Sequence, residues 1–367
     1  MSDKLKLPSL WIKGFRCFGS LKIERLGRVN LIVGKNNSGK SSLLEALRLY
    51  ASEAHPLVLL EILESRNEMA EPPEEVLLRK VDEPIRVPAV LHLFHGYPQA
   101  FGELAPIEVG PIEADRIPSL VIAATEQTAE HGHRRQNSLQ SRGPALRIDF
   151  GGRERILPLE ELVELLNRRR FYYDSEAVFR LPCVSLGRAG TDRFNKVARL
   201  WDRVALTEKE SLVEEGLRIL SPEIERVSFV GEEKLTGRIP VARTARSPKP
   251  VPLGNLGGGV NRVFELMLST VNAEGGLLLV DEFEDDLHYS VQPQIWQKVF
   301  HLAENLNIQV FATTHSWDCV KAFQDAAASQ QQEPVLIRLT RLDDDVVADI
   351  FEQREITIAT QNEIEIR

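Results

Sequence analysis

Two glycines, a lysine and a serine stand at fixed spacing near the start of the chain. Residues 34–41 are GKNNSGKS and match the phosphate-loop pattern G-x-x-x-x-G-K-[ST]. In this pattern, inward-pointing backbone N–H groups surround phosphate oxygens, and the next helix adds the positive end of its dipole. The expected chemistry is nucleotide binding, with Lys40 on the β- and γ-phosphates and the Ser41 hydroxyl on Mg²⁺.

The segments beside this loop provide the context that the motif requires. Residues 29–33 (VNLIV) predict a buried strand, and residues 42–47 predict a helix. We therefore expect the nucleotide to contact a set of loop residues, namely Gly34, Asn36, Asn37, Ser38, Gly39, Lys40, Ser41 and Ser42.

A second group of candidate residues follows the apolar run 277–280 (LLLV), where Asp281 and Glu282 are adjacent. Ligands of open α/β sheets bind at the carboxyl ends of strands, which is where these acids would lie. Asp281 would share Mg²⁺ with Ser41, and Glu282 would orient or deprotonate the attacking water. Acids after a strand are common, so the pattern is informative only together with the phosphate loop.

Two further segments could contact the γ-phosphate. His315 follows the apolar strand predicted at 308–313 and could hydrogen-bond the phosphate or the water, or merely cap a strand–helix turn. Gly257, Gly258 and Gly259 precede a predicted helix, whose N-terminus could hold phosphate, although a glycine hinge is the alternative. With Lys40 and Glu282, His315 completes the predicted catalytic set.

Alternation of apolar strands with helices predicts an α/β fold with a mostly parallel core sheet. Prolines across 56–118 favour irregular β structure and loops, whereas 160–170 and 191–220 are predicted to be helical. Residues 145–157 and 335–351 resemble hairpins. We expect a nucleotide-binding core from 1–55 and 191–367, with a β-rich and helical region inserted at 56–190.

Composition limits the class of protein. The 367 residues are 43% hydrophobic and 27% charged, and no apolar stretch approaches the ~20 residues of a membrane span. The N-terminus lacks an apolar signal core, and three scattered cysteines suggest neither disulfides nor zinc, so a cytoplasmic location is expected. A net charge of −9 argues against a surface that binds nucleic acid throughout, but it allows a local basic groove.

The order and spacing of the four motifs resemble the ABC-type ATPase head of the SMC, RecF and RecN proteins. The segments DEFEDDLHYS and FATTHS are most similar to the overcoming-lysogenization-defect (OLD) group. The resemblance covers about residues 8–50 and 195–325. It implies a P-loop NTPase of ABC type, with an antiparallel β subdomain and a helical insertion, that uses ATP and Mg²⁺.

In this family two heads enclose two nucleotides, and the signature helix of each copy contacts the γ-phosphate held by the other. The resemblance therefore implies a homodimer that forms on ATP and separates after hydrolysis. About 50 residues follow His315, too few for the TOPRIM nuclease domain of OLD nucleases. We therefore expect a separate effector, a nuclease or toxin, with antiphage defence as one setting. The alternative is a RecF-like ATPase that binds DNA in repair or maintenance.

The chain also departs from the family pattern. Gly257 stands where many signatures have serine, which predicts slow hydrolysis, and Asp286 stands where a small residue is expected. Lys13 and Arg16 precede the loop and are expected near the nucleotide base. The pairs His92/His95 and His131/His133 lack a third ligand, so no metal is expected there.

Overall fold

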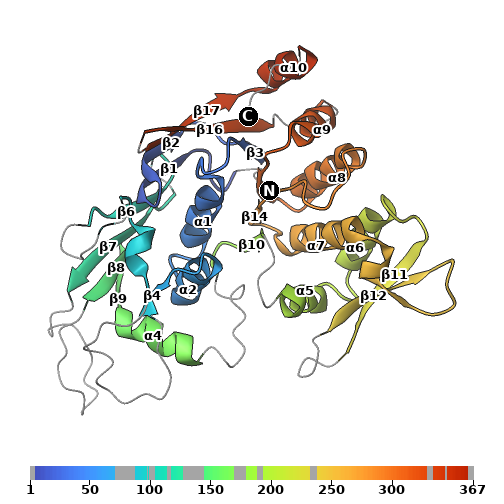
Figure 1. Cartoon of the computed structure of the whole chain (residues 1–367), viewed down its shortest axis with the longest axis horizontal. Helices are drawn as coiled ribbons and strands as arrows, with labels where there is room; N and C mark the ends of the chain where they lie inside the picture. The colour runs from blue at the N-terminus through green and yellow to red at the C-terminus, as the bar shows by residue number, and fades with distance from the viewer. Residues whose placement is uncertain are drawn as a thin grey trace.

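The computed structural model has a six-stranded central sheet with helices on both faces (Figure 1). The structure describes residues 5–70, 87–96, 98, 104–113, 117–126, 144–168, 179–187, 193–231, 238–328, 334–343 and 345–362. In order, the strands of the central sheet are β10 (Cys183–Leu186), β14 (Leu277–Val280), β15 (Gln309–Thr313), β3 (Val29–Val33), β16 (Val335–Leu342) and β17 (Asp345–Phe351). All neighbours pair in parallel except the β16–β17 hairpin, so the predicted mostly parallel sheet is confirmed.

The continuous apolar runs arise because this sheet is covered on both faces. Successive side chains of a strand point to opposite sides. Leu278 and Val280 therefore pack in one core with α7 (Gly258–Asn272), α8 (Gln292–Asn305) and α9 (Trp317–Ala327). Leu277 and Leu279 join the other core with α1 (Lys40–Ala51) and α2 (Pro56–Ser65).

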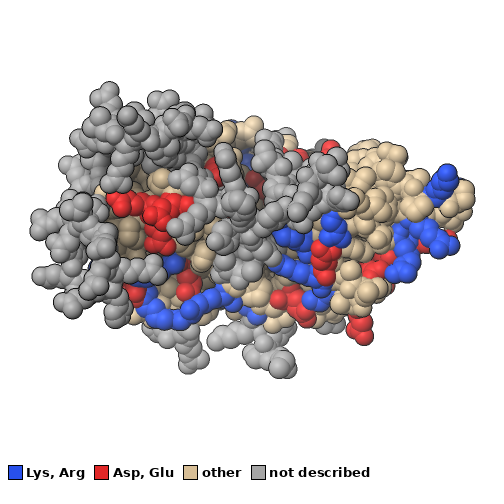
Figure 2. Space-filling model, turned by 90° about the horizontal axis from the view of Figure 1, so that it is seen from below, with Lys and Arg blue, Asp and Glu red and all other residues tan. Residues whose placement is uncertain are grey.

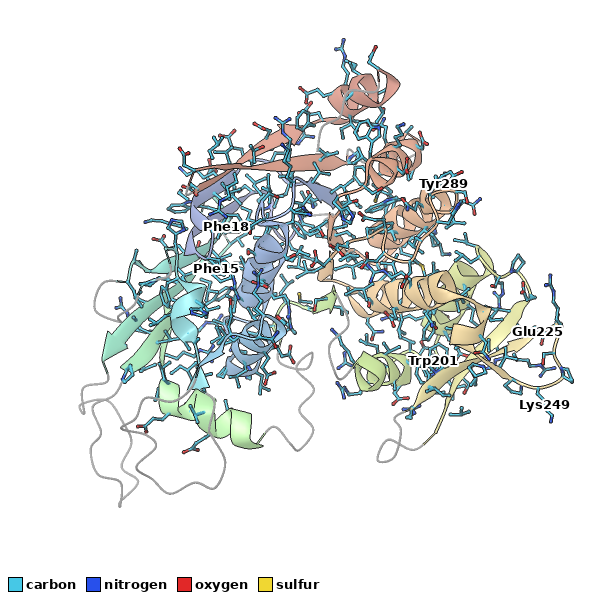
Figure 3. All side chains as sticks on the ribbon, in the orientation of Figure 1. Phe15, Phe18, Trp201, Glu225, Lys249 and Tyr289 are labelled. Atoms are coloured by element: carbon cyan, nitrogen blue, oxygen red, sulfur yellow. The ribbon has the colours of Figure 1, made fainter. Side chains whose placement is uncertain are left out.

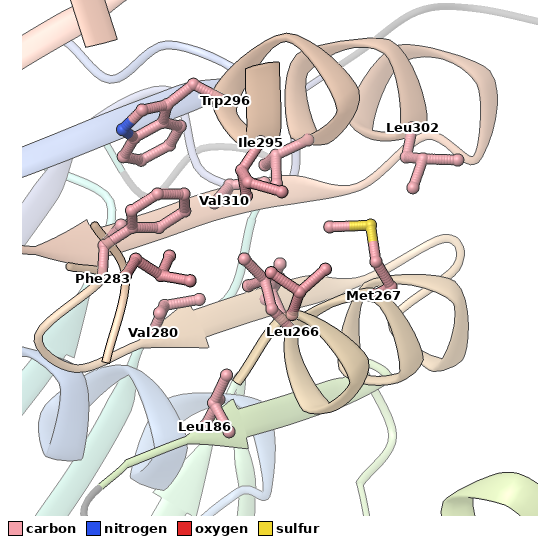
Figure 4. Packing of buried hydrophobic residues seen from close by; sticks show 14 of the residues in the cluster. Leu186, Leu266, Met267, Val280, Phe283, Ile295, Trp296, Leu302 and Val310 are labelled. Atoms are coloured by element: carbon pink, nitrogen blue, oxygen red, sulfur yellow. The ribbon is translucent and has the colours of Figure 1, made fainter. Parts of the chain in front are cut away.

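Aromatic packing holds α8 against the end of β14. The rings of Phe283 and Trp296 stack with centroids 3.7 Å apart and planes 9° apart, and both side chains are fully buried. Figure 4 shows this pair beside Val280, with Leu266 and Ile295 of the two covering helices converging on the same core. The turn that follows β14 is thereby fixed to the helical layer.

A second, antiparallel sheet contains the N-terminal strands together with the inserted region. Its order is β2 (Phe18–Ile23), β1 (Leu10–Phe15), β6 (Ile107–Gly110), β7 (Leu120–Glu126), β8 (Pro144–Phe150) and β9 (Arg153–Pro158). Phe15 and Phe18, labelled in Figure 3, are fully buried beneath it. The predicted domain boundary at residue 55 separates β1 and β2 from the other strands of this sheet. The predicted boundary at residue 190 places β10, a strand of the central sheet, in the insertion.

A third unit carries β11 (Ile224–Val230), β12 (Ile239–Thr244) and β13 (Val251–Pro252). The helical stretch predicted at 191–220 is two helices, α5 (Arg193–Asp202) and α6 (Glu208–Arg218). The break occurs at Leu206, whose φ is 63°, and at Thr207, whose side chain caps α6 by accepting from the Lys209 N–H. Glu210, three positions after Thr207, does not complete a capping box, because its carboxylate accepts from the Leu206 N–H and not from the Thr207 N–H.

The structure corrects the prediction of loops and β structure at the start of 56–118. Residues 56–65 form α2, a buried helix that begins with Pro56 at its first turn and has His55 as its N-cap. Proline is well tolerated at that position, so it marks a helix start here and not a break. Further elements of the insertion are β4 (Met69–Ala70), β5 (Val87–Pro88) and η1 (Val90–Leu93), and the helix predicted at 160–170 is α4 (Leu159–Arg168).

The C-terminal strands β16 and β17 lie at one edge of the central sheet. The β16–β17 hairpin was expected, and α10 (Gln353–Gln361) follows it with a capping box formed by Glu352 and Glu355. Asp345 does more than fill a solvated turn, because its carboxylate accepts from the N–H of Gly19 at 3.0 Å. Among the described residues, no helix has both the length and the apolar character needed to cross a membrane.

A buried ionic cluster includes Glu45 of α1. Arg16 is 2% exposed, and its guanidinium pairs with Glu45 and with Glu68, each at 2.7 Å. Arg66 also pairs with Glu45 at 2.7 Å and donates to the Ser42 hydroxyl at 3.1 Å. Burial raises the pKa of Glu45, against the effect of the two arginines. Arg16 is therefore committed to carboxylates, and the expectation that it approaches a nucleotide base is wrong.

Substituting Arg16→Met should lower the free energy of unfolding by about 3 kcal/mol, because it leaves buried carboxylates without their main counter-charge. The matched control is Arg25→Met, since the Arg25–Glu352 pair is 45% and 63% exposed. This control should change stability by less than about 1 kcal/mol. Urea unfolding followed by circular dichroism measures both. Equal losses in the two variants would show that the cluster does not stabilise the fold as described.

Candidate nucleotide-binding site

The phosphate loop depends on glycine at two places. Gly34, directly after β3, has a φ of 150°, and a Cβ there would lie 2.5 Å from the Leu339 carbonyl oxygen. Gly39 has a φ of 94°, and a Cβ there would lie 2.8 Å from the sulfur of Cys17. Only glycine fits such a close approach with a positive φ. The loop is thus packed tightly against β16 and the β1–β2 turn.

The helices that start at the two predicted phosphate contacts both begin at a glycine. Both α1 and α7 have a glycine N-cap, no side-chain cap and no acid in the first turn. In contrast, α6 and α9 are capped by the side chains of Thr207 and Ser316. Uncapped N–H groups and the helix dipole favour an anion at such an end.

Lys40 lies over the loop from which it arises. Its ammonium donates to the carbonyl oxygens of Gly34 at 2.6 Å and Lys35 at 3.0 Å. Burial lowers the pKa of Lys40, and the nearby carboxylates of Asp281, Glu282 and Glu284 oppose this shift. The cation therefore lies within the field of the acids that follow β14.

The other predicted loop contacts differ in exposure. Asn36, Asn37 and Ser41 are exposed, whereas Ser38 is 3% exposed. Within the described residues, the Ser38 hydroxyl is a buried polar atom without a hydrogen-bond partner. Such an atom normally has a partner, and a phosphate oxygen would supply one.

Asp281 joins the loop to the central sheet. One of its oxygens accepts from the Ser41 hydroxyl at 2.9 Å, and the other accepts from the Thr313 hydroxyl at 2.6 Å. Parallel pairing makes this possible, since Val280 is opposite Ala312 and Thr313 is opposite Ile32. Neighbouring oxygens around an octahedral Mg²⁺ at 2.0–2.1 Å are about 2.9 Å apart. Ser41 and Asp281 therefore have the donor type and separation that Mg²⁺ requires.

Glu282 is held in a strained conformation. Its φ is 50°, a value that non-glycine residues rarely adopt. Its N–H donates to the Thr313 hydroxyl at 2.9 Å, and its carbonyl oxygen accepts from Arg262 at 2.5 Å. Arg262 is 4% exposed and also donates to the carbonyl oxygen of Asp281 at 3.0 Å. Such strain persists where surrounding contacts determine the backbone, and it is common at functional sites.

His315 lies at the end of the neighbouring strand β15, where the sequence predicted it. Its backbone N–H donates to an oxygen of Glu284 at 3.0 Å, and its Nδ1 is 3.2 Å from the same oxygen. The His315 side chain is 52% exposed, whereas that of Glu284 is 10% exposed. The structure thus brings together Lys40, Ser41, Asp281, Glu282 and His315 at the carboxyl edge of one sheet.

Sequence reasoning missed three residues that organise this edge: Thr313, Arg262 and Glu284. Thr313 is the last residue of an apolar strand, and a buried hydroxyl at that position was the available signal. Arg262 follows the glycine segment by three positions, but nothing in the sequence indicates that it turns towards Asp281. Glu284 is one acid among several in DEFEDD, so its role is apparent only from the structure.

The glycine segment starts α7 on the face of the sheet opposite α1. Gly257 has a φ of 113°, and a Cβ on Gly259 would lie 3.0 Å from the Asp286 carbonyl oxygen. A Cβ on Gly258 would be 3.7 Å from the Asp286 carboxyl carbon, an ordinary contact. Asp286, the unexpected acid of the sequence, therefore lies beside the start of α7 in the same chain.

The structure also places His95 and the three cysteines. His95 Nδ1 is 2.9 Å from the Arg16 carbonyl oxygen, and the described residues contain no group of three metal-ligating side chains. His131 and His133 lie outside the described residues. The cysteines are free, and burial raises the pKa of Cys319 to about 12.

Basic side chains gather at the end of the molecule that carries β11 and β12 (Figure 2, right). Arg243, Arg246 and Lys249 are exposed there, and Figure 3 shows Lys249 and Glu225 at this end. Several of these charges are paired, as Arg243 is with Glu225 at 3.0 Å and Arg238 with Asp202 at 2.5 Å. The basic residues at 134–135 and 169–170 lie outside the described residues.

The family model described as "AAA ATPase domain" matches residues 5–80 and 195–320, which is more than half of the chain. The chain belongs to this family. A relative named "ATP/GTP phosphatase" from Helicobacter pylori is 23% identical over 332 residues, which are 86% of each chain. The "Uncharacterized protein MJECL10" of Methanocaldococcus jannaschii is 52% identical over 46 residues, 12% of this chain and 21% of that protein.

The fold of this AAA ATPase is similar to that of an SMC head. A crystal structure of the SmcHead bound to the C-winged helix domain of ScpA matches with a TM-score of 0.53 and 13% identity, over 94% of this chain and 97% of that one. This similarity confirms the predicted fold, that of an SMC-type ATPase head, and the family match shows the predicted ATPase domain.

Thr313→Val should lower the free energy of unfolding by about 1–3 kcal/mol, because the Glu282 N–H and the Asp281 carboxylate lose a shared partner. Thr313→Ser keeps the hydroxyl and should lose less. Urea unfolding of both variants without nucleotide measures the difference. If valine and serine were equally tolerated, the hydroxyl would not be what holds this turn.

Proposed function

We propose that this AAA ATPase binds ATP with Mg²⁺ and hydrolyses it. The observation that carries the proposal is the 2.9 Å hydrogen bond between Ser41 and Asp281, two residues separated by 240 positions. It places the hydroxyl of a phosphate loop beside a carboxylate at the carboxyl edge of the sheet. The relative named ATP/GTP phosphatase supports a hydrolytic reaction.

In this proposal each residue of the edge has one role. Lys40 exchanges its two loop carbonyls for the β- and γ-phosphates, and Ser38, Gly39 and the start of α1 bind phosphate oxygens. Glu282 accepts a proton from the attacking water, and His315 hydrogen-bonds the γ-phosphate or that water. Mg²⁺ held by Ser41 and Asp281 would neutralise charge that develops between the phosphates.

We further propose that the nucleotide lies between two copies of the chain. The uncapped ends of α1 and α7 are on opposite faces of the central sheet, because their helices belong to different cores. In this proposal the two ends of one chain therefore face two different triphosphates. A second copy could present Gly257, Gly258 and Gly259 to the γ-phosphate, which gives a closed, symmetric dimer.

ATP-dependent pairing would serve to control a partner protein in the cytoplasm. The SMC head of similar fold is bound to a domain of ScpA, which supports the idea that such heads act through partners. We propose a nuclease or toxin as the effector, with antiphage defence as the setting. DNA as a direct partner ranks second, because acids pair with several of the exposed arginines.

Glu282→Gln should reduce ATP turnover by about 10²–10⁴-fold, the usual contribution of a general base, while ATP binding persists. ATP should then hold the variant as a dimer in light scattering. Lys40→Ala is the control, because it should lose ATP binding and remain a monomer. Unchanged turnover by a monomeric Glu282→Gln protein would contradict the proposal.

A further inference from the structure

Glu284 is the third acid after β14, two positions beyond Glu282. One of its oxygens accepts a hydrogen bond from the backbone N–H of His315 at 3.0 Å and lies 3.2 Å from Nδ1 of the same residue. The carboxylate therefore contacts the histidine at two points, which fixes the backbone and the ring together.

Burial of Glu284 and packing of its neighbours restrict the movement of its side chain away from His315. Its side chain is 10% exposed, and its second oxygen is buried without a hydrogen-bond partner among the described residues. Cys319 of α9 lies near enough for the Glu284 charge to contribute to the raised pKa of that thiol. Phe283, the preceding residue, is fully buried and stacked on Trp296. A carboxylate held in this way has little freedom to leave the histidine.

The backbone around His315 is fixed from the other side as well. The Ser316 hydroxyl accepts from the Cys319 N–H and caps α9, and the Thr314 hydroxyl accepts from the Ser316 N–H. His315 is therefore placed between a buried strand and a capped helix, and the ring torsions are its main remaining freedom. Glu284 restricts that freedom.

We propose that Glu284 is the positioning residue of His315. A carboxylate facing Nδ1 accepts a hydrogen bond only if Nδ1 carries the proton, so the contact selects one tautomer and directs Nε2 away from Glu284. Carboxylates behind histidines orient the ring in the same way in many active sites. This inference rests on the proposed function, in which the oriented Nε2 hydrogen-bonds the γ-phosphate or the attacking water.

A double-mutant cycle in ATP turnover tests the inference. Glu284→Ala should lower kcat by about 10–100-fold with little change in the Kd for ATP. His315→Ala should lower kcat to a similar level, and the double variant should be no slower than His315→Ala alone. Glu284→Gln should restore most of the rate, because its amide oxygen can still accept from Nδ1. The control Glu215→Ala removes an exposed acid that pairs with Lys298 and should keep the wild-type rate.

The histidine tautomer gives a readout that needs no catalysis. Long-range ¹H–¹⁵N spectra of ¹⁵N-histidine-labelled protein should show the Nδ1–H tautomer for His315, identified by the signals that His315→Ala removes. Glu284→Ala should shift that residue towards the Nε2–H tautomer. Multiplicative losses of kcat, or a tautomer unaffected by Glu284→Ala, would overturn the inference. If the wild-type protein lacked ATPase activity, the proposed function would fail, but the tautomer would still report on Glu284.

Discussion

Parallel pairing of β14, β15 and β3 is the constraint on which the candidate site depends. It brings Asp281, Thr313 and the loop after β3 to one sheet edge, although they are far apart in sequence. Thr313 then acts as a bridge, because its hydroxyl donates to Asp281 and accepts from the Glu282 N–H. Without this register the acids would not reach Ser41, and the phosphate loop would remain an isolated turn.

The same edge of the sheet contains strained backbone and buried charged groups, both of which destabilise the fold. Glu282 and Asn37 have positive φ, Lys40 loses hydration, and one oxygen of Glu284 is buried without a described partner. The surrounding structure offsets this cost through two large apolar cores and through Arg262, which holds two carbonyl oxygens of the turn. These contacts fix the turn that carries Asp281 and Glu282 before any ligand binds, which is the condition for electrostatic preorganisation.

Much of this arrangement could be predicted from the sequence, and the reasons are local. The phosphate loop, the strand before Asp281 and the hairpin at 335–351 have short-range signals that tertiary contacts do not override. The sequence pattern does not predict the helix at Pro56, because a proline-rich stretch favours loops, although proline suits the first turn of a helix. The burial of Arg16 and the contacts of Arg262 and Glu284 could not be predicted, since each depends on a residue from a distant segment.

The central claim is that one nucleotide is held by two copies of the chain. It is tested most directly by mixing Lys40→Ala protein with Gly258→Leu protein, because Gly258 has room for a side chain within its own chain. Each variant alone should be inactive, and Gly258→Leu should still bind ATP. In an equal mixture, each heterodimer contains one site with an intact loop facing an intact α7 and one site without either, so at most about half of the wild-type ATPase rate should return. A mixture that remains inactive, or full activity of Gly258→Leu alone, would contradict the account.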